Sequence, residues 1–271
     1  MSKVDFAIIG GTGAFTEGKQ DERLNNSESI EIATKYGNVT LEVIEVNGSK
    51  VALLKRHGLN HSIPPHKINY RANIMALKML GVKKVLTTAA VGLLNREFKP
   101  GELVLLNDFI DFTHGRDSTF FDGEGQEVIH VDMSIPYCLF LRNKLRDAAK
   151  DTGISLVTEE ATYVCTQGPR FETPAEISMY RNLGADLVGM TSVPEVVLAR
   201  EAEMCYATVA IVTNYAAGIS DNPLTHQEVL ERMAMSSEKI YTLFNKTIEI
   251  INSDEPCFCQ TAVSGQESLG G

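Results

Sequence analysis

The sequence predicts an α/β fold: one domain with a central mixed β-sheet flanked by helices. Short apolar runs typical of buried strands alternate with segments whose apolar residues recur at helical spacing, which is the pattern of β–α–β units. Residues 29–34 and 39–46 alternate between apolar and polar side chains and are bordered by the turn sequences Tyr36-Gly37-Asn38 and Asn47-Gly48, which indicates a meander or hairpin of antiparallel strands. No repeat or linker interrupts this succession. One domain is therefore expected over residues 1–252, with a disordered tail over residues 253–271.

In the first half of the chain, two apolar runs end in residues suited to binding an anion. Residues 4–10 lead into the sequence Gly-Gly-Thr-Gly at residues 10–13, and residues 51–55 lead into Arg-His-Gly at residues 56–58. Both features would lie at the carboxyl end of a strand, where open α/β sheets bind ligands. The other strands expected here cover residues 29–34, 39–46, 82–90 and 102–106.

A helical stripe over residues 69–80 ends at Gly81. Residues 108–132 form a polar and aromatic stretch that is long for a connection inside a compact domain. We expect this stretch to be functional or to contact another subunit.

In the second half, the best-marked helix follows Gly168 and Pro169, a dipeptide that ends the preceding strand. Thr173 is the expected N-cap, Pro174 suits the first helical position, and Glu176 completes a capping box. Helices are expected over residues 136–152, 173–184, 194–205 and 224–252, and strands over residues 161–165, 186–190 and 206–213.

The composition excludes several classes of protein. A net charge of −10 argues against general nucleic-acid binding, which requires a basic surface. No apolar run approaches the roughly 20 residues that a membrane-spanning helix needs, and the first residues lack the architecture of a signal peptide. The five cysteines are odd in number and scattered, which suits a reduced protein better than a disulfide framework. We therefore expect a cytoplasmic protein without a nucleic-acid or membrane partner.

The histidines and cysteines do not form a recognisable metal-binding motif. His61 and His66 lie on either side of two prolines and lack acidic neighbours, and Cys257 and Cys259 are close in sequence but have no accompanying histidine cluster. No metal is therefore expected.

Side chains that bind anions follow several of the expected strands. Arginine is permanently charged and forked, and a protonated histidine donates from both ring nitrogens, so Arg56 and His57 suit a phosphate. Hydroxyl and backbone N–H groups at other strand ends can complete such a site. The candidate anion-binding residues are Thr12, Arg56, His57, Thr88, Ala89 and Thr191.

A second set of residues suits a flat heterocycle. Phe171 offers an aromatic ring and Met190 a thioether wall, whereas Glu172 and Asn214 offer polar groups for the edge of the heterocycle. No serine or cysteine has an evident base nearby in the sequence for nucleophilic catalysis, so phosphate itself is a candidate nucleophile.

Six ordered motifs resemble those of the purine nucleoside phosphorylase and methylthioadenosine phosphorylase family of the trimeric type. They are G-G-T-G, R-H-G-x-x-H, T-T-A-x-x-G, G-P-R-F-E-T, G-M-T-S-V-P-E and T-N-Y-A-A-G, and the resemblance extends over residues 8–233. It implies the nucleoside phosphorylase fold and the reversible, phosphate-dependent cleavage of an N-glycosidic bond. It also implies a homotrimer or a dimer of trimers, with inorganic phosphate as co-substrate and no metal or organic cofactor.

The resemblance also implies a role for individual residues. The six candidate anion-binding residues fall on the phosphate positions of the family, with His57 and Asn214 as catalytic residues. The substrate positions are Phe171, Glu172, Met190, Asn214, Tyr215, Ala216, His226 and His130, the last lent by a neighbouring subunit.

Three positions bear on the substrate. Members that act on methylthioadenosine usually carry a serine and an aspartate where this sequence has Glu172 and Asn214. An ionised carboxylate accepts from the N1–H that a 6-oxopurine presents, whereas adenine has a lone pair there. His226 falls where enzymes for nucleosides with a free 5′-hydroxyl have a histidine. The sequence therefore predicts inosine and guanosine as substrates. The alternatives are methylthioinosine, methylthioadenosine and a non-catalytic purine-binding protein.

Overall fold

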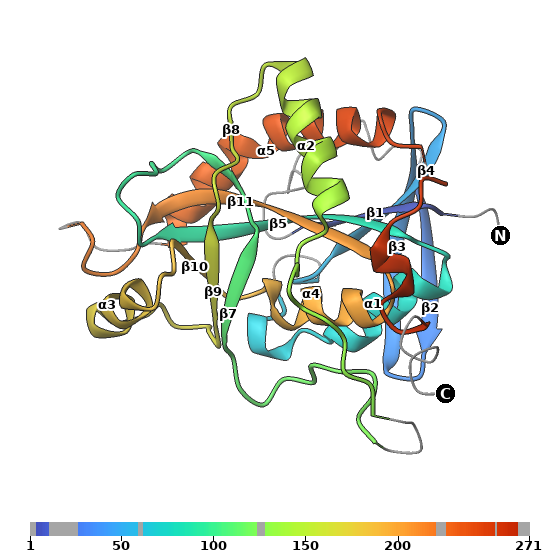
Figure 1. Ribbon diagram of the computed structural model, residues 1–271, viewed down its shortest axis with the longest axis horizontal. Coiled ribbons are helices and arrows are strands. Elements are labelled where there is room, and N and C mark those ends of the chain that lie inside the picture. Colours follow the sequence, from blue (N-terminus) through green and yellow to red (C-terminus); the bar gives the residue numbers. More distant parts are fainter. Residues whose placement is uncertain are drawn as a thin grey trace.

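A mixed β-sheet forms the centre of the molecule, and helices cover both of its faces (Figure 1). The computed structural model describes residues 4–10, 27–58, 62–123, 128–220, 226–252 and 254–264, without the side chains of residues 226 and 228. The predicted α/β fold with a mixed sheet between helices is confirmed.

In the described ranges the strands are β1 (Phe6–Gly10), β2 (Glu28–Thr34), β3 (Gly37–Val46), β4 (Ser49–Lys55), β5 (Lys84–Leu93), β6 (Leu103–Leu105), β7 (Asp108–Phe112), β8 (Leu156–Val157), β9 (Thr162–Thr166), β10 (Leu187–Gly189) and β11 (Cys205–Tyr215). The α-helices are α1 (Tyr70–Met79), α2 (Leu139–Thr152), α3 (Pro174–Asn182), α4 (Ser192–Glu201) and α5 (His226–Glu249), and short 3₁₀ helices are η3 (Pro65–Lys67) and η4 (Phe258–Thr261).

The order of the strands combines an antiparallel start with a parallel centre. The path runs β2-β3-β4-β1-β5-β10-β9-β7, and β11 continues the sheet from β5 to β6 and β8. As predicted, β2, β3 and β4 form an antiparallel meander. Asn47 and Gly48 connect β3 to β4 with φ angles of 50° and 78°, the positive values that a tight type I′ hairpin turn requires. In the centre, β1 pairs in parallel with β4 and β5, and β5 in parallel with β11.

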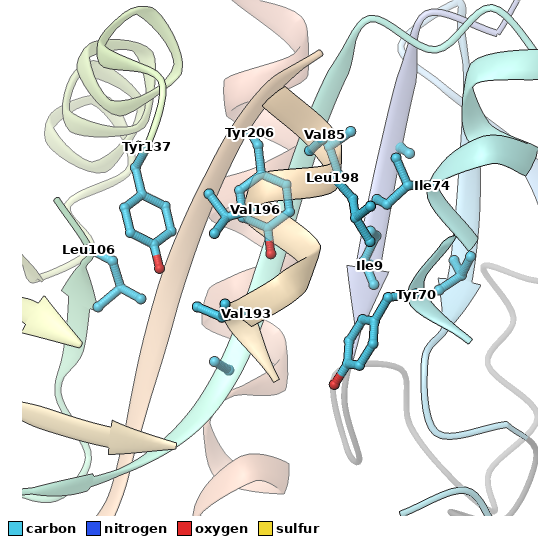
Figure 2. Packing of buried hydrophobic residues seen from close by; sticks show 14 of the residues in the cluster. Ile9, Tyr70, Ile74, Val85, Leu106, Tyr137, Val193, Val196, Leu198 and Tyr206 are labelled. Atoms are coloured by element: carbon cyan, nitrogen blue, oxygen red, sulfur yellow. The ribbon is translucent and has the colours of Figure 1, made fainter. Parts of the chain in front are cut away.

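Alternation of side chains along the central strands divides the core between the two faces. In β1, Ala7 and Ile9 join the cluster that contains α1 and α4, whereas Phe6 and Ile8 join the cluster that contains α2 and α5. Figure 1 shows these helix pairs on opposite sides of the sheet. Figure 2 shows buried residues of the α1–α4 cluster, among them Ile74, Val196 and Leu198 with Ile9 and Val85 of the sheet.

The predicted capping box at the start of α3 is confirmed. The Thr173 hydroxyl accepts from the backbone N–H of Glu176 at 3.2 Å, and the Glu176 carboxylate accepts from the N–H of Thr173 at 2.7 Å. Local sequence therefore determines where this helix begins, directly after the loop that follows β9.

Three expectations about the elements were wrong. The helix expected over residues 194–205 ends at Glu201, and Cys205 already belongs to β11, because Glu203 adopts a positive φ of 60° that does not continue a helix. The long connection at residues 108–132 begins with β7, a strand with two exposed aspartates among partly buried apolar residues that pairs in parallel with β9. Residues 254–264 do not fit the expected disordered tail: they include η4, in which Cys259 is buried. In the described part of the chain, no helix has the length and apolar character to cross a membrane.

Candidate active site

One cavity of about 450 Å³ gathers residues from strand ends that lie far apart in the sequence. Six parts of the chain form its wall. They are the residues directly after β4, the end of β5, the loop after β9, the segment from β10 into α4, the end of β11, and helix α5. Of the sequence-predicted residues, those that line it are Arg56, His57, Phe171, Glu172, Met190, Thr191, Asn214 and Ala216.

The charged end of the cavity is built on a buried ion pair. Arg56 donates from Nε and Nη2 to the two carboxylate oxygens of Glu195, at 3.0 and 2.6 Å, and from Nη1 to the carbonyl of Thr88 at 2.6 Å. Both side chains of the pair are buried, with exposed fractions of 1% and 0%. Tyr206 donates a third hydrogen bond to Glu195 at 2.7 Å. The guanidinium is therefore fixed in orientation before any ligand binds.

This arrangement keeps Arg56 charged. Burial disfavours the charged form, but the attraction and hydrogen bonds of Glu195 outweigh it and hold the pKa of Arg56 above its usual value. Three of the five guanidinium N–H groups point at Glu195 and Thr88, which leaves two for an anion in the cavity.

His57 and Thr191 line the same cavity as Arg56, and hydrogen bonds hold each of them in place. The Nδ1 of His57 donates to the carbonyl of Ile63 at 2.8 Å, which sets the tautomer and the orientation of the ring. The backbone N–H of Thr191 donates to the Tyr163 hydroxyl at 3.1 Å. A Cβ at Gly189 would lie 2.6 Å from the same hydroxyl, so only glycine permits this approach.

A carboxylate and an amide lie in the other part of the cavity. The Thr166 hydroxyl donates to Glu172 at 2.6 Å, and burial raises the pKa of Glu172 above its usual value. Asn214 accepts from the Thr213 hydroxyl at 2.6 Å and donates to the Tyr215 carbonyl at 2.9 Å. These bonds fix the amide oxygen and nitrogen of Asn214 relative to the cavity.

A β-bulge presents Asn214 to the cavity. The register between β11 and β5 shifts between Val212 and Asn214, so that Asn214 lies opposite Gly92 and Thr213 is the extra residue. Consecutive side chains in a regular strand face opposite sides of the sheet. Here the bulge allows Thr213 and Asn214 both to line the cavity.

Residues 5–249 match the model of the phosphorylase superfamily. The chain belongs to this superfamily. It is 52% identical, over 97% of its length and 98% of the relative's, to a probable 6-oxopurine nucleoside phosphorylase of Dictyoglomus turgidum. It is 47% identical, over 97% and 99% of the two chains, to a probable S-methyl-5′-thioinosine phosphorylase of Methanopyrus kandleri. A methylthioadenosine phosphorylase structure from an antarctic soil metagenomic library is similar with a TM-score of 0.89, 36% identity and coverage of 98% of this chain and 92% of that one.

Not every predicted site residue lies on the wall of the phosphorylase cavity. Thr88 and Ala89 are buried beside it in β5, where Thr88 contributes its carbonyl to Arg56. Tyr215 packs against the core, and His130 is an exposed residue outside the cavity. Thr12 lies outside the described residues. His226 begins α5, but its side chain also lies outside them.

Two residues that support the phosphorylase site were missed by sequence reasoning. Glu195 lies 139 residues from its partner Arg56, so no local pattern connects them, although it belongs to the G-M-T-S-V-P-E motif. Arg116, within the long polar connection, donates to the backbone carbonyls of Thr166 and Gln167 and to those of Met190 and Val193, at 2.7–3.1 Å. Arg116 is a positioning residue that ties the loop after β9 to the segment after β10.

The helix α5 adds an apolar part to the cavity wall. Val229 and Met233, one and two turns after the start of α5, both line the cavity. Their side chains lie on the same face of the helix because residues four apart are neighbours there.

Proposed function

We propose that the protein is a purine nucleoside phosphorylase that cleaves 6-oxopurine nucleosides, inosine and guanosine, with inorganic phosphate as co-substrate and without an organic cofactor. The observation that carries this proposal is the composition of one cavity. A fixed cation, Arg56, lies in it together with a carboxylate–amide pair, Glu172 and Asn214. The names of the relatives support the same reaction.

An oxyanion suits the charged end. The Thr88 hydroxyl is buried and has no hydrogen-bond partner among the described residues, and a phosphate oxygen next to Arg56 would supply one. Phosphate held here by Arg56, His57 and Thr191 would be the nucleophile. Its oxygen forms the bond to the ribose C1′ while the bond from C1′ to the base breaks, and the electron pair leaves with the base. Thr12 remains a proposed phosphate ligand.

A 6-oxopurine suits the other end. Ionised Glu172 can accept the N1–H of hypoxanthine or guanine, and Thr166 occupies only part of its four lone-pair sites. The amide of Asn214 can hydrogen-bond to the edge of the base and stabilise the charge that develops there as the bond to C1′ breaks. Phe171 and Met190 would contact the base and the ribose, with Ala216 beside them.

Base release from a panel of nucleosides tests the reaction and its specificity. Inosine, guanosine, adenosine and methylthioadenosine are incubated with the protein, each with and without phosphate. We expect release of base only from inosine and guanosine and only with phosphate. An Arg56→Met variant prepared in parallel is expected to be inactive and so controls for contaminating host enzymes. Release from methylthioadenosine alone would overturn the specificity, and release without phosphate would indicate hydrolysis.

S-Methyl-5′-thioinosine is the second candidate substrate. The apolar side chains of Val229 and Met233 line the cavity, and an apolar wall accommodates a methylthio group better than a hydroxyl. The relative from Methanopyrus kandleri bears this name. Adding methylthioinosine to the panel separates the two candidates, because His226 in the cavity would favour inosine and an apolar wall would favour the methylthio compound.

Binding of the base is expected to depend on pH through Glu172. Its pKa is raised by burial, so the carboxylate takes up a proton at a higher pH than an ordinary glutamate, and acidification removes the acceptor for N1–H. The affinity for hypoxanthine should be full above the raised pKa and fall as the pH falls through it. Calorimetric titration with hypoxanthine in the absence of phosphate measures this. In Glu172→Gln the dependence should disappear, and an unchanged profile would contradict the assignment.

Quaternary structure and location complete the proposal. We infer a homotrimer or a dimer of trimers in the cytoplasm, in which His130 of one subunit reaches the cavity of its neighbour. The exposure of His130 outside its own cavity supports this arrangement. The net charge of −10 is unfavourable for a nucleic-acid partner.

A further inference from the structure

The C-terminal segment at residues 254–264 is attached to the body of the protein at several points. Glu255 forms an ion pair with Lys144 of α2 at 3.4 Å. The carboxylate of Glu203 accepts from the N–H groups of Val263 and Ser264 at 3.2 and 3.0 Å. Between these contacts, Cys259 has an exposed fraction of 1%. The segment therefore has a defined position next to the start of β11.

This position brings four cysteines together from three parts of the chain. Cys138 precedes α2, Cys205 is the first residue of β11, and Cys257 and Cys259 belong to the C-terminal segment. Their four sulfur atoms all lie within 4.8 Å of one another, and Cys138 Sγ and Cys257 Sγ are 3.5 Å apart. None of the four forms a disulfide. We call these residues the four-cysteine cluster.

The spacing of the sulfur atoms suits a tetrahedral metal ion. Four thiolates at about 2.3 Å from Zn²⁺ lie about 3.8 Å from one another. The cluster has one sulfur pair at 3.5 Å and no pair beyond 4.8 Å. A disulfide would require about 2.05 Å between two sulfurs. Three of the four cysteines are buried and Cys257 is partly buried, so a bound ion would be shielded from water.

Two buried cations lie beside the cluster. Arg200, with an exposed fraction of 3%, donates from Nη1 to the sulfur of Cys259 at 3.2 Å. Lys84 is fully buried and lies opposite Cys205 in the pairing of β5 with β11. A Zn²⁺ ion with four thiolates carries a net charge of −2, which these two cations would balance.

We propose that the four-cysteine cluster binds one Zn²⁺ ion as a structural site. All four positions of the tetrahedron would be filled by thiolates, which leaves none for a substrate, and the thiol protons are released on binding. The ion joins the C-terminal segment to the start of α2 and to the start of β11. Sequence reasoning considered Cys257 and Cys259 as an isolated pair, because only the fold brings Cys138 and Cys205 to them.

Metal content of the full chain tests the proposal directly. The protein is purified without an affinity tag or added metal, and its zinc is measured by inductively coupled plasma mass spectrometry. We expect about one Zn²⁺ per chain. The Cys257→Ser/Cys259→Ser variant should contain almost none, and the Cys165→Ser variant, which changes the one cysteine outside the cluster, should retain it. Removal of zinc from the wild-type protein by a chelator should lower Tm on the order of 5 °C, and added Zn²⁺ should restore it.

Two other results would overturn the site. An intact mass about 4 Da below the fully reduced value, without bound zinc, would show that the cluster forms two disulfides. Iron in place of zinc, or zinc that persists in the double variant, would show that the ion or its ligands are different. The measurements on the wild-type protein decide the question even if the double variant does not fold.

Discussion

The Glu195→Gln variant is expected to lose about 3–5 kcal/mol of unfolding free energy, because it leaves the buried charge of Arg56 without its partner. The guanidinium would also lose the bidentate contact that orients it toward the cavity. A displacement of about 1 Å at a site that positions a reactant can cost about 100-fold in rate, so kcat/KM for phosphate should fall by that order. Urea denaturation and phosphate-dependent initial rates measure the two effects.

Glu201→Gln is the matched control for this prediction. Glu201 lies on the same helix and is also buried, but its carboxylate accepts hydrogen bonds from Thr119 and from the N–H of Phe120, away from Arg56. This variant is expected to lose stability while its KM for phosphate stays unchanged. If the two variants had the same KM for phosphate, the role proposed for Arg56 and Glu195 would be wrong.

Exchange of the two base-facing residues is expected to change the preferred base. In Glu172→Ser/Asn214→Asp the acceptor for the N1–H of a 6-oxopurine is lost. The new carboxylate at position 214 would face the carbonyl of Tyr215, to which Asn214 now donates. Each buried polar group left without a partner costs about 1–3 kcal/mol, so the ratio of kcat/KM for inosine over adenosine should fall about 10- to 100-fold per position.

Steady-state kinetics of the double variant and both single variants, with inosine and adenosine, check this expectation. The KM for phosphate serves as the internal control, since neither substitution touches Arg56 or His57. A ratio that did not change would place the discrimination of the base elsewhere in the cavity.

Features set by neighbouring residues were predicted well from the sequence. The capping box of Thr173 and Glu176 and the hairpin at Asn47-Gly48 depend on contacts within a few residues, and both are present. The strand β7 was missed because its exposed, acidic side chains at Asp108 and Asp111 lack the apolar pattern of a buried strand.

Among the residues around the cavity, those with local sequence signals were predicted and those that depend on distant partners were not. Arg56, Glu172 and Asn214 were found because each follows an expected strand and carries a group with evident chemistry. Glu195 and Arg116 were missed because they act through partners at a long distance in the sequence: Glu195 orients Arg56, and Arg116 binds backbone carbonyls, which no side-chain pattern reveals. The position of a buried charge depends on tertiary packing, and a single sequence does not supply it.

Because of the bulge, the length of β11 as well as the identity of its residues determines how Asn214 is held in the cavity. Because Thr213 is one residue more than β5 has opposite it, its deletion would restore regular alternation and keep Asn214 opposite Gly92, but would remove the hydroxyl that donates to the Asn214 amide oxygen. The pairing of β5 and β11 on the N-terminal side of this point would remain. A change in the length of this strand would therefore alter how the base-facing amide is held, whereas a substitution alters which group faces the base.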